Sequence, residues 1–147
     1  MNLYTIGFTQ KSAQRFFKLI NDNKIELLLD IRLNNSSQLA GFSKGSDLQY
    51  FLKELCNCEY KHSLEFAPTE AILSAYKKKA INWESYVEAY TALIKSRNVL
   101  SQIDEIFMKY KSICLLCSEP THENCHRGVL ANMISYALPN IIIKHLE

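Results

Sequence analysis

The chain has 147 residues, of which 48% are hydrophobic and 22% charged, and its formal net charge at pH 7 is only +2. These values predict one globular domain over residues 1–147, without the strongly basic stripe that dedicated nucleic-acid binders carry. Five cysteines cannot all pair in disulfides, and no apolar run approaches the about 20 residues of a membrane-spanning helix. We therefore expect a reduced, cytoplasmic protein with no membrane partner.

Two kinds of hydrophobic spacing alternate along the chain. Short, nearly continuous apolar runs predict strands at residues 3–6, 25–31, 58–62, 113–117 and 141–143. Helical spacing and capping residues predict helices at 12–21, after Ser46 or Asp47, from Pro68 and Thr69, after Asn82, around 103–110 and at 124–138. A polar loop is expected at 34–45. The alternation predicts an α/β fold of three layers, with a mostly parallel sheet of about five strands and helices on both faces.

Three segments leave the predicted strands at one edge of the sheet, namely residues 7–9, 30–32 and 117–119. Because ligands of parallel sheets bind outside the carboxyl ends of the strands, we expect these segments to converge on a binding site. Gly7 would permit a tight turn or a close backbone approach there. Asp30 and Arg32 could face the pocket as an acid and an anion-binding group, or they could pair with each other.

The fourth predicted strand ends in a group of reactive side chains. Residues three apart on a strand point to opposite faces, so we expect Cys114 in the core and Cys117 at the strand end, available for chemistry. Glu119 could act as a general base or a hydrogen-bond acceptor beside the Cys117 thiol. Alternatively, Glu119 could form a structural ion pair with Arg32 or Arg127.

The residues Cys125, His126 and Arg127 fall in the first turn of the helix that follows. The backbone amides of a helix N-terminus lower the pKa of a thiol and bind anions. His126 could carry a proton, and Arg127 could clamp a phosphate or carboxylate with two hydrogen bonds. In the alternative interpretation, Cys125 packs beneath the helix and Arg127 braces the loop.

Zinc is a further alternative near this helix. Four side chains would suit the ion as ligands, namely Cys117, His122, Cys125 and His126. Their spacing differs from that of the common zinc fingers, and adjacent residues rarely ligate the same tetrahedral ion. We therefore expect no cofactor, with zinc as the alternative. The aromatic residues Trp83, Tyr86 and Tyr90 follow helical spacing and are expected in the core rather than on a stacking surface.

Several short segments, taken in order, resemble one known family. They are Thr5-Ile6-Gly7, Asp30-Ile31-Arg32, residues 64–69, Trp83-x-x-Tyr86, and Cys117-x-Glu119 with Cys125-His126-Arg127. Together they resemble the family catalogued as domain of unknown function 488. The resemblance implies an α/β fold and a shared pocket, with no established reaction, and a role near nucleotides or nucleic acid. Phe8-Thr9 departs from the His-Ser that is usual in the family, which removes an imidazole from the pocket.

We therefore expect a small cytoplasmic enzyme with an anion pocket at the strand ends, whose ligand is a phosphorylated small molecule or a nucleotide. The residues expected to take part in catalysis are Cys117, Glu119, Cys125, His126 and Asp30. Those expected to bind the anion are Gly7, Arg32 and Arg127. One alternative is a non-catalytic nucleic-acid-binding module that contacts phosphates through the loop 34–45 with Arg32 and Lys44, and through the lysines at 77–79. Another is a structural polar cluster without catalysis.

Overall fold

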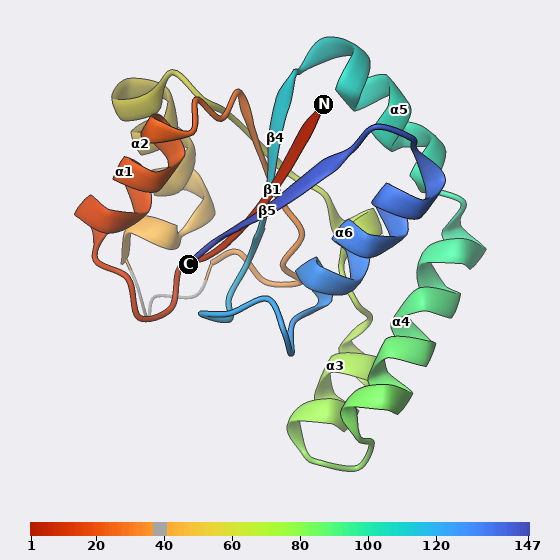
Figure 1. The fold of residues 1–147 in the computed structure, drawn as a ribbon. Coiled ribbons are helices and arrows are strands. Elements are labelled where there is room, and N and C mark those ends of the chain that lie inside the picture. Colours follow the sequence, from red (N-terminus) through yellow and green to blue (C-terminus); the bar gives the residue numbers. More distant parts are fainter. Residues whose placement is uncertain (37–40) are drawn as a thin grey trace.

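The computed structural model describes residues 1–36 and 41–147 (Figure 1). Part of the predicted loop at 34–45 falls on residues 37–40, which lie outside the described residues. Within the described residues, five strands form a single sheet in the order β3-β2-β4-β1-β5, and every strand pairing in it is parallel. The strands are β1 (Asn2–Gly7), β2 (Leu27–Asp30), β3 (Glu59–His62), β4 (Ser112–Cys117) and β5 (Ile142–Leu146). The predicted α/β fold with a parallel sheet is confirmed.

The described part of the chain forms six α-helices, which connect or flank the strands. They are α1 (Ala13–Asp22), α2 (Gly45–Cys56), α3 (Glu70–Lys77), α4 (Trp83–Arg97), α5 (Leu100–Lys109) and α6 (His126–Ala137), with short 3-10 turns at Gly41–Ser43 and Leu64–Phe66. The expected cap of α4 is present, because Asn82 accepts a hydrogen bond from Ser85 N. Thr69, expected at the start of α3, is its N-cap and accepts a hydrogen bond from Ile72 N. No helix of the described residues is both long and apolar enough to cross a membrane.

The start of α2 differs from the prediction. The helix begins at Gly45, so the expected caps Ser46 and Asp47 lie inside its first turn. The N-cap residue is Lys44, which forms no side-chain capping hydrogen bond. Asp47 nevertheless stabilises the helix, because its carboxylate lies near the positive end of the helix dipole.

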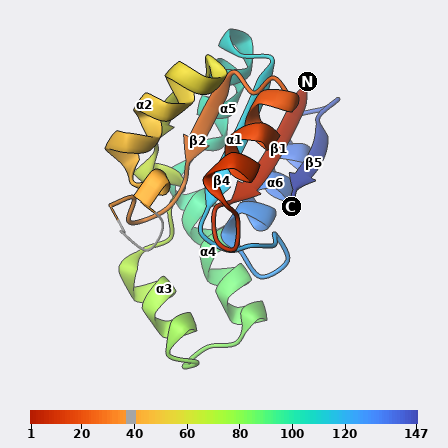
Figure 2. The same cartoon turned by 90° about the vertical axis from the view of Figure 1, so that its left-hand side faces the viewer.

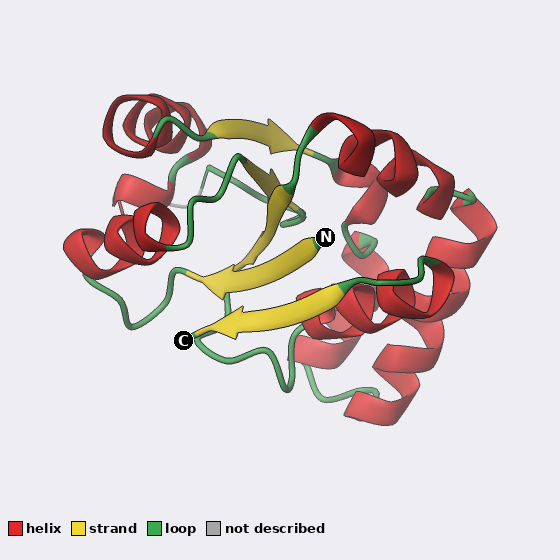
Figure 3. Cartoon of the chain, turned by 45° about the horizontal axis from the view of Figure 1, so that its top comes forward, coloured by secondary structure: helices red, strands yellow, loops and turns green. Residues whose placement is uncertain are grey.

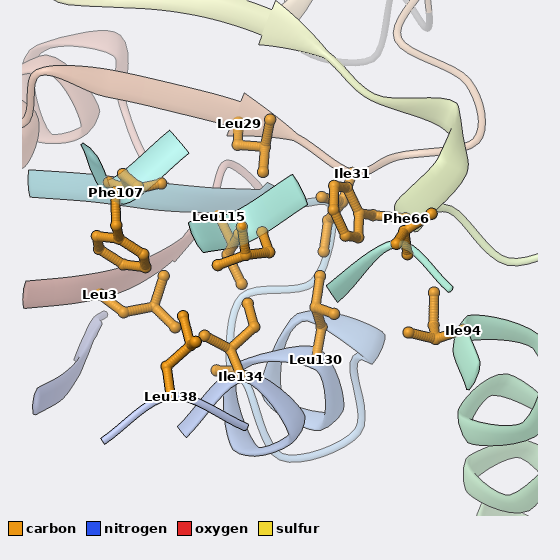
Figure 4. Close-up of a cluster of buried hydrophobic side chains, with 14 of the residues drawn as sticks. Leu3, Leu29, Ile31, Phe66, Ile94, Phe107, Leu115, Leu130, Ile134 and Leu138 are labelled. Atoms are coloured by element: carbon orange, nitrogen blue, oxygen red, sulfur yellow. The ribbon is translucent and has the colours of Figure 1, made fainter. Parts of the chain in front are cut away.

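Helices cover both faces of the sheet, as Figure 3 shows. On one face α1 and α2 pack through a cluster that includes Phe16, Leu48 and the fully buried Cys114. On the other face α4, α5 and α6 pack against the larger cluster drawn in Figure 4. The sheet is therefore the middle layer between two hydrophobic cores, as the three-layer prediction requires.

The chain leaves neighbouring strands toward opposite faces. The helices after β1 and β2 lie on the first face, whereas α6, which follows β4, lies on the second. Since β4 pairs with both β1 and β2, the loops diverge at the carboxyl ends of these three strands. Such a divergence forms the crevice in which open α/β sheets bind ligands. The hairpin of α3 and α4 extends past this end of the sheet (Figure 2).

Candidate functional site

A cleft with a volume of about 1120 Å³ lies at the divergence of the strands. All three segments expected there contribute to its lining, with Phe8 and Thr9 after β1, Arg32 after β2, and Cys117 through Glu119 after β4. Hydrogen bonds join the segments, since Thr9 N donates to the Ser118 carbonyl at 3.2 Å. The opposite wall comes from the α3–α4 hairpin. The expected convergence is therefore present.

Cys117 and His126 meet at the floor of the cleft. The Cys117 Sγ lies 3.5 Å from His126 Nδ1, and His126 Nε2 lies 2.8 Å from the Ile31 carbonyl oxygen. A carbonyl oxygen only accepts, so Nε2 carries a proton and donates it in this bond. In the neutral ring Nδ1 is then the acceptor that faces the thiol. The Ile31 carbonyl thus fixes both the tautomer and the orientation of the imidazole.

The two thiols near His126 have opposite pKa shifts. Burial raises the pKa of Cys117, but the hydrogen bond with Cys125, the charge of Arg127 and backbone amides outweigh burial, and the net pKa is lowered. The pKa of Cys125 is raised well above its usual value by burial and by the neighbouring Cys117. The lowering expected for Cys125 at the helix N-terminus is therefore wrong, because burial outweighs the helix dipole.

Arg127 lies beneath the loop that carries the cleft rather than at the cleft surface. Its side chain is fully buried and donates to Thr5 Oγ1 at 3.3 Å, the Glu119 carbonyl at 2.7 Å and the Pro120 carbonyl at 3.5 Å. Gly7 approaches the same loop, because a Cβ at this position would overlap the Glu119 carbonyl group. Arg127 and Gly7 therefore hold the β4–α6 loop in place.

Asp30 and Arg32 pair with each other in the buried layer below the cleft. Arg32 Nε donates to Asp30 Oδ1 at 2.8 Å, and Arg32 Nη2 donates to Asp30 Oδ2 at 2.7 Å. Tyr60 donates its hydroxyl proton to the same carboxylate at 2.6 Å, and burial raises the pKa of Tyr60 to about 12. The pKa of Arg32 is raised, because the bond to Asp30 and its charge outweigh the opposing effect of burial. Arg32 also lines the cleft, whereas Asp30 does not.

Glu119 contributes its backbone rather than its carboxylate to the packing. The side chain is exposed at the cleft, and within residues 1–36 and 41–147 it forms no ion pair with Arg32 or Arg127. The structural ion pair considered from the sequence is therefore wrong. The general-base role of Glu119 stays a prediction.

A row of aromatic rings connects the cleft wall with His126. Trp83 stacks on Tyr86 at 5.1 Å between ring centroids, Tyr86 stacks on Tyr90 at 6.3 Å, and Tyr90 meets His126 edge-on at 5.4 Å. Tyr86 and Tyr90 are buried, as expected for core residues. Trp83 was also expected in the core; it packs against the core, but it is partly exposed and lines the cleft.

Lys11 and Tyr76 are among the cleft residues that the sequence did not point to. Lys11 follows β1 and could have been found from its distance of four residues from Gly7, at the edge where the strands end. Tyr76 carried no such signal, because its place depends on how the α3–α4 hairpin docks. The lysines 77 and 79 also line the cleft, although a solvated helix face would explain a lysine run equally well.

Three of the four residues considered as zinc ligands come together. The ligand atoms of Cys117, Cys125 and His126 lie within 4.8 Å of one another, and all three residues are buried. This donor set suits zinc chemically. His122 lies elsewhere, stacked on His145 at 3.5 Å with its Nδ1 2.6 Å from the Glu147 carboxylate.

Comparison with known proteins gives one match. The family model described as Domain of unknown function DUF488 matches residues 12–134, which is most of the chain. No curated protein and no solved structure matches the sequence. The matched region includes Asp30, Arg32, Cys117 and the Cys125-His126-Arg127 triplet, whereas Gly7 lies before it. The chain belongs to the DUF488 family.

Proposed function

We propose that the protein is a cytoplasmic enzyme that acts on an anionic substrate of the phosphate or nucleotide type, with Cys117 as nucleophile and His126 as proton carrier. The observation that carries this proposal is the Cys117–His126 contact at the cleft floor, with His126 oriented by the Ile31 carbonyl. A nucleophile, a base and a group that orients the base are the parts of covalent catalysis.

The reaction follows from these positions. The Cys117 proton passes to His126 Nδ1, and the thiolate attacks an electrophilic carbon or phosphorus atom of the substrate. The bond from that atom to its leaving group breaks, and the leaving group takes the proton from His126. Water, deprotonated by His126, then attacks the covalent intermediate, and the sulfur leaves as the thiolate. His126 passes this second proton to the Cys117 thiolate, which restores the starting thiol and imidazole, so water is the reactant consumed besides the substrate.

The charges around the cleft favour an anionic substrate. Lys11, Lys77 and Lys79 line it, whereas Glu119 is the one carboxylate that the described residues contribute to the lining. The charge of Arg32, which also lines the cleft, is compensated by Asp30. Such a distribution raises the local concentration of anions and speeds their arrival. Five cysteines without a disulfide fit the reducing conditions of the cytoplasm, where the proposal places the protein.

We assign supporting roles to four residues that were expected to act directly. Asp30 is occupied by Arg32 and Tyr60, so we assign it to holding Arg32 rather than to moving protons. Arg127 and Gly7 shape the loop above the site. Cys125, with its raised pKa, donates a hydrogen bond to the Cys117 sulfur and helps to keep it as a thiolate.

The test is the rate at which iodoacetamide alkylates each cysteine of the native protein, followed by mass spectrometry. Cys117 is expected to react faster than Cys56 at neutral pH, although Cys56 is the more exposed thiol, because only the Cys117 pKa is lowered. His126→Gln is expected to slow the labelling of Cys117, whereas Cys58→Ser serves as the matched control and leaves it unchanged. Labelling of Cys117 no faster than that of Cys56 refutes the nucleophile.

A non-catalytic nucleic-acid module is the second candidate, and the lysines at the cleft rim favour it. Of the contacts expected for it, Arg32 is buried in its pair with Asp30, and residues 37–40 lie outside the described residues. Anisotropy of a labelled single-stranded oligonucleotide tests this candidate. Affinity that falls steeply with salt, and falls further in Lys77→Ala and Lys79→Ala, supports it; salt-independent or absent binding removes it.

A further inference from the structure

Among the described residues, one nitrogen of the Arg32 guanidinium has no hydrogen-bond partner. Nε and Nη2 donate to the Asp30 carboxylate, and Nη2 also donates to the Ser43 carbonyl at 2.7 Å. Nη1 is buried and has no hydrogen-bond partner in the described part of the chain. The side chain is only 2% exposed. Two N–H donors of a charged group are thus left unpaired, which is rare in folded proteins.

The environment of Arg32 keeps Nη1 from turning to another protein acceptor. The hydrogen bonds to Asp30 and Ser43 fix the guanidinium plane. The Phe8 ring lies against the guanidinium group, with 5.2 Å between the ring centroid and Arg32 Cζ. Asp30 is itself fixed by Tyr60, and Asn35 donates to the Tyr60 hydroxyl at 3.0 Å. Arg32 therefore stands as a rigid donor in the wall of the cleft.

We propose that Arg32 Nη1 is the donor of an oxyanion subsite that holds the phosphate group of the substrate. Nη1 supplies two directed N–H donors, which match the oxygens of a phosphate. The pairing with Asp30 compensates the charge of Arg32, so the excess positive charge comes from Lys11 and the lysines at 77 and 79. A ligand with full negative charge and several acceptor oxygens satisfies both features.

The start of α6 adds a second source of attraction for the anion. Its N-cap, Cys125, forms no side-chain capping hydrogen bond, and the N-cap residue and His126 both line the cleft. The N-terminus of a twelve-residue helix carries partial positive charge and favours phosphate. The subsite thus lies between Arg32 on one strand end and α6 on the next.

The subsite lies beside the nucleophile. Strands β2 and β4 are neighbours, with Asp30 paired to Leu116, and strands in a sheet are about 4.8 Å apart. Arg32 follows the Ile31 carbonyl that orients His126. A phosphate on Nη1 therefore brings the atoms attached to it next to the Cys117 sulfur. The subsite deepens the proposed function and rests on it for the reaction, whereas binding of phosphate alone does not require the reaction.

The probe is inorganic phosphate, added to the full chain with arginine side chains labelled by ¹⁵N. Phosphate is expected to shift the guanidinium signals of Arg32 in a saturable way, while those of Arg15, an exposed arginine outside the cleft, stay unchanged. Arg32→Lys keeps the charge but loses the fixed Nη1 donors, so its affinity is expected to fall about tenfold or more. Arg15→Lys makes the same chemical change and serves as the matched control.

Because Arg32→Lys could unfold the protein, a second measurement uses the wild type alone. Phosphate on the subsite is expected to slow the alkylation of Cys117 and to leave that of Cys56 unchanged. Phosphate that binds without shifting the Arg32 signals, or fails to bind at millimolar concentration, overturns the subsite. If phosphate shifts Arg32 while Cys117 alkylates no faster than Cys56, the subsite stands and the nucleophile falls, so the two failures are distinguishable.

Discussion

Replacing Asp30 by alanine is the sharpest test of the buried pair under the cleft. The carboxylate accepts four hydrogen bonds, from Arg32 N at 3.1 Å, Arg32 Nε at 2.8 Å, Arg32 Nη2 at 2.7 Å and the Tyr60 hydroxyl at 2.6 Å. Both Asp30 and Arg32 are buried, at 0% and 2% exposure. Asp30→Ala leaves a buried guanidinium without its counter-ion, which costs about 3–5 kcal/mol.

The loss is large against the about 5–15 kcal/mol by which such domains are stable. Tyr60→Phe removes one of the four hydrogen bonds and is expected to cost about 1 kcal/mol, so it calibrates the scale. Urea unfolding, followed by the fluorescence of the single tryptophan, Trp83, measures the free energies of unfolding.

A double-mutant cycle with Arg32→Met isolates the pair. Apolar residues in place of both partners of a buried pair are often tolerated, so Asp30→Ala with Arg32→Met is expected to be more stable than Asp30→Ala alone. If the free energy of unfolding of Asp30→Ala lies within about 1 kcal/mol of the wild-type value, the loss is too small for a broken buried pair and the reasoning is refuted. Losses that simply add in the double mutant refute it as well.

Three further predictions concern other parts of the chain. Gly7→Ala is expected to lower the free energy of unfolding by about 3 kcal/mol or more, measured by urea unfolding, because its Cβ would overlap backbone atoms of the β4–α6 loop; an unchanged unfolding curve contradicts this. Asn82→Ala removes the cap of α4 and is expected to cost about 1 kcal/mol in the same assay, with the exposed Asn132→Ala as the control. Burial and the stacked His122 lower the pKa of His145, so the unfolded chain takes up the proton more readily and stability falls as pH drops below the ordinary histidine pKa. His145→Gln is expected to weaken this acid sensitivity in unfolding curves recorded at several pH values, and equal sensitivity in both proteins would show that other groups cause it.

The secondary structure could be predicted because its signals are local. The caps Thr69 and Asn82 each precede a run of helical spacing, and the structure uses both. The start of α2 was predicted too late, because Ser46 and Asp47 are both common capping residues. The helix instead begins at Gly45, directly after the 3-10 turn Gly41–Ser43 and the N-cap Lys44. The parallel sheet followed from the alternation of strands and helices, which depends on no single residue.

The roles of the charged groups could not be predicted, because they depend on which loops meet. Asp30 with Arg32 had two interpretations of equal merit, and the buried geometry settled that they pair. Arg127 donates to the carbonyl of Glu119, and the same carbonyl lies against Gly7, which precedes Arg127 by 120 residues in the chain. Bracing of the loop by Arg127 was one of two interpretations of the sequence, and no local pattern could choose between them.

The convergence of adjacent residues was also beyond the sequence. Cys125 and His126 were not expected to ligate one ion, because adjacent residues rarely do, yet the ligand atoms of both lie near the Cys117 sulfur. The reason is a change of backbone conformation between them, since Cys125 is the extended N-cap of α6, with φ of −137° and ψ of 141°, and His126 is its first helical residue. Helical periodicity does not apply across such a boundary.

The α3–α4 hairpin has a consequence for how such a protein can diversify. It supplies one wall of the cleft but no strand of the sheet, and it carries neither Cys117 nor Arg32. Selection can therefore alter residues of the hairpin that face the cleft, such as Tyr76 and Lys79, and change which ligand fits while the floor stays the same. A library for directed evolution of new specificity would be placed there first.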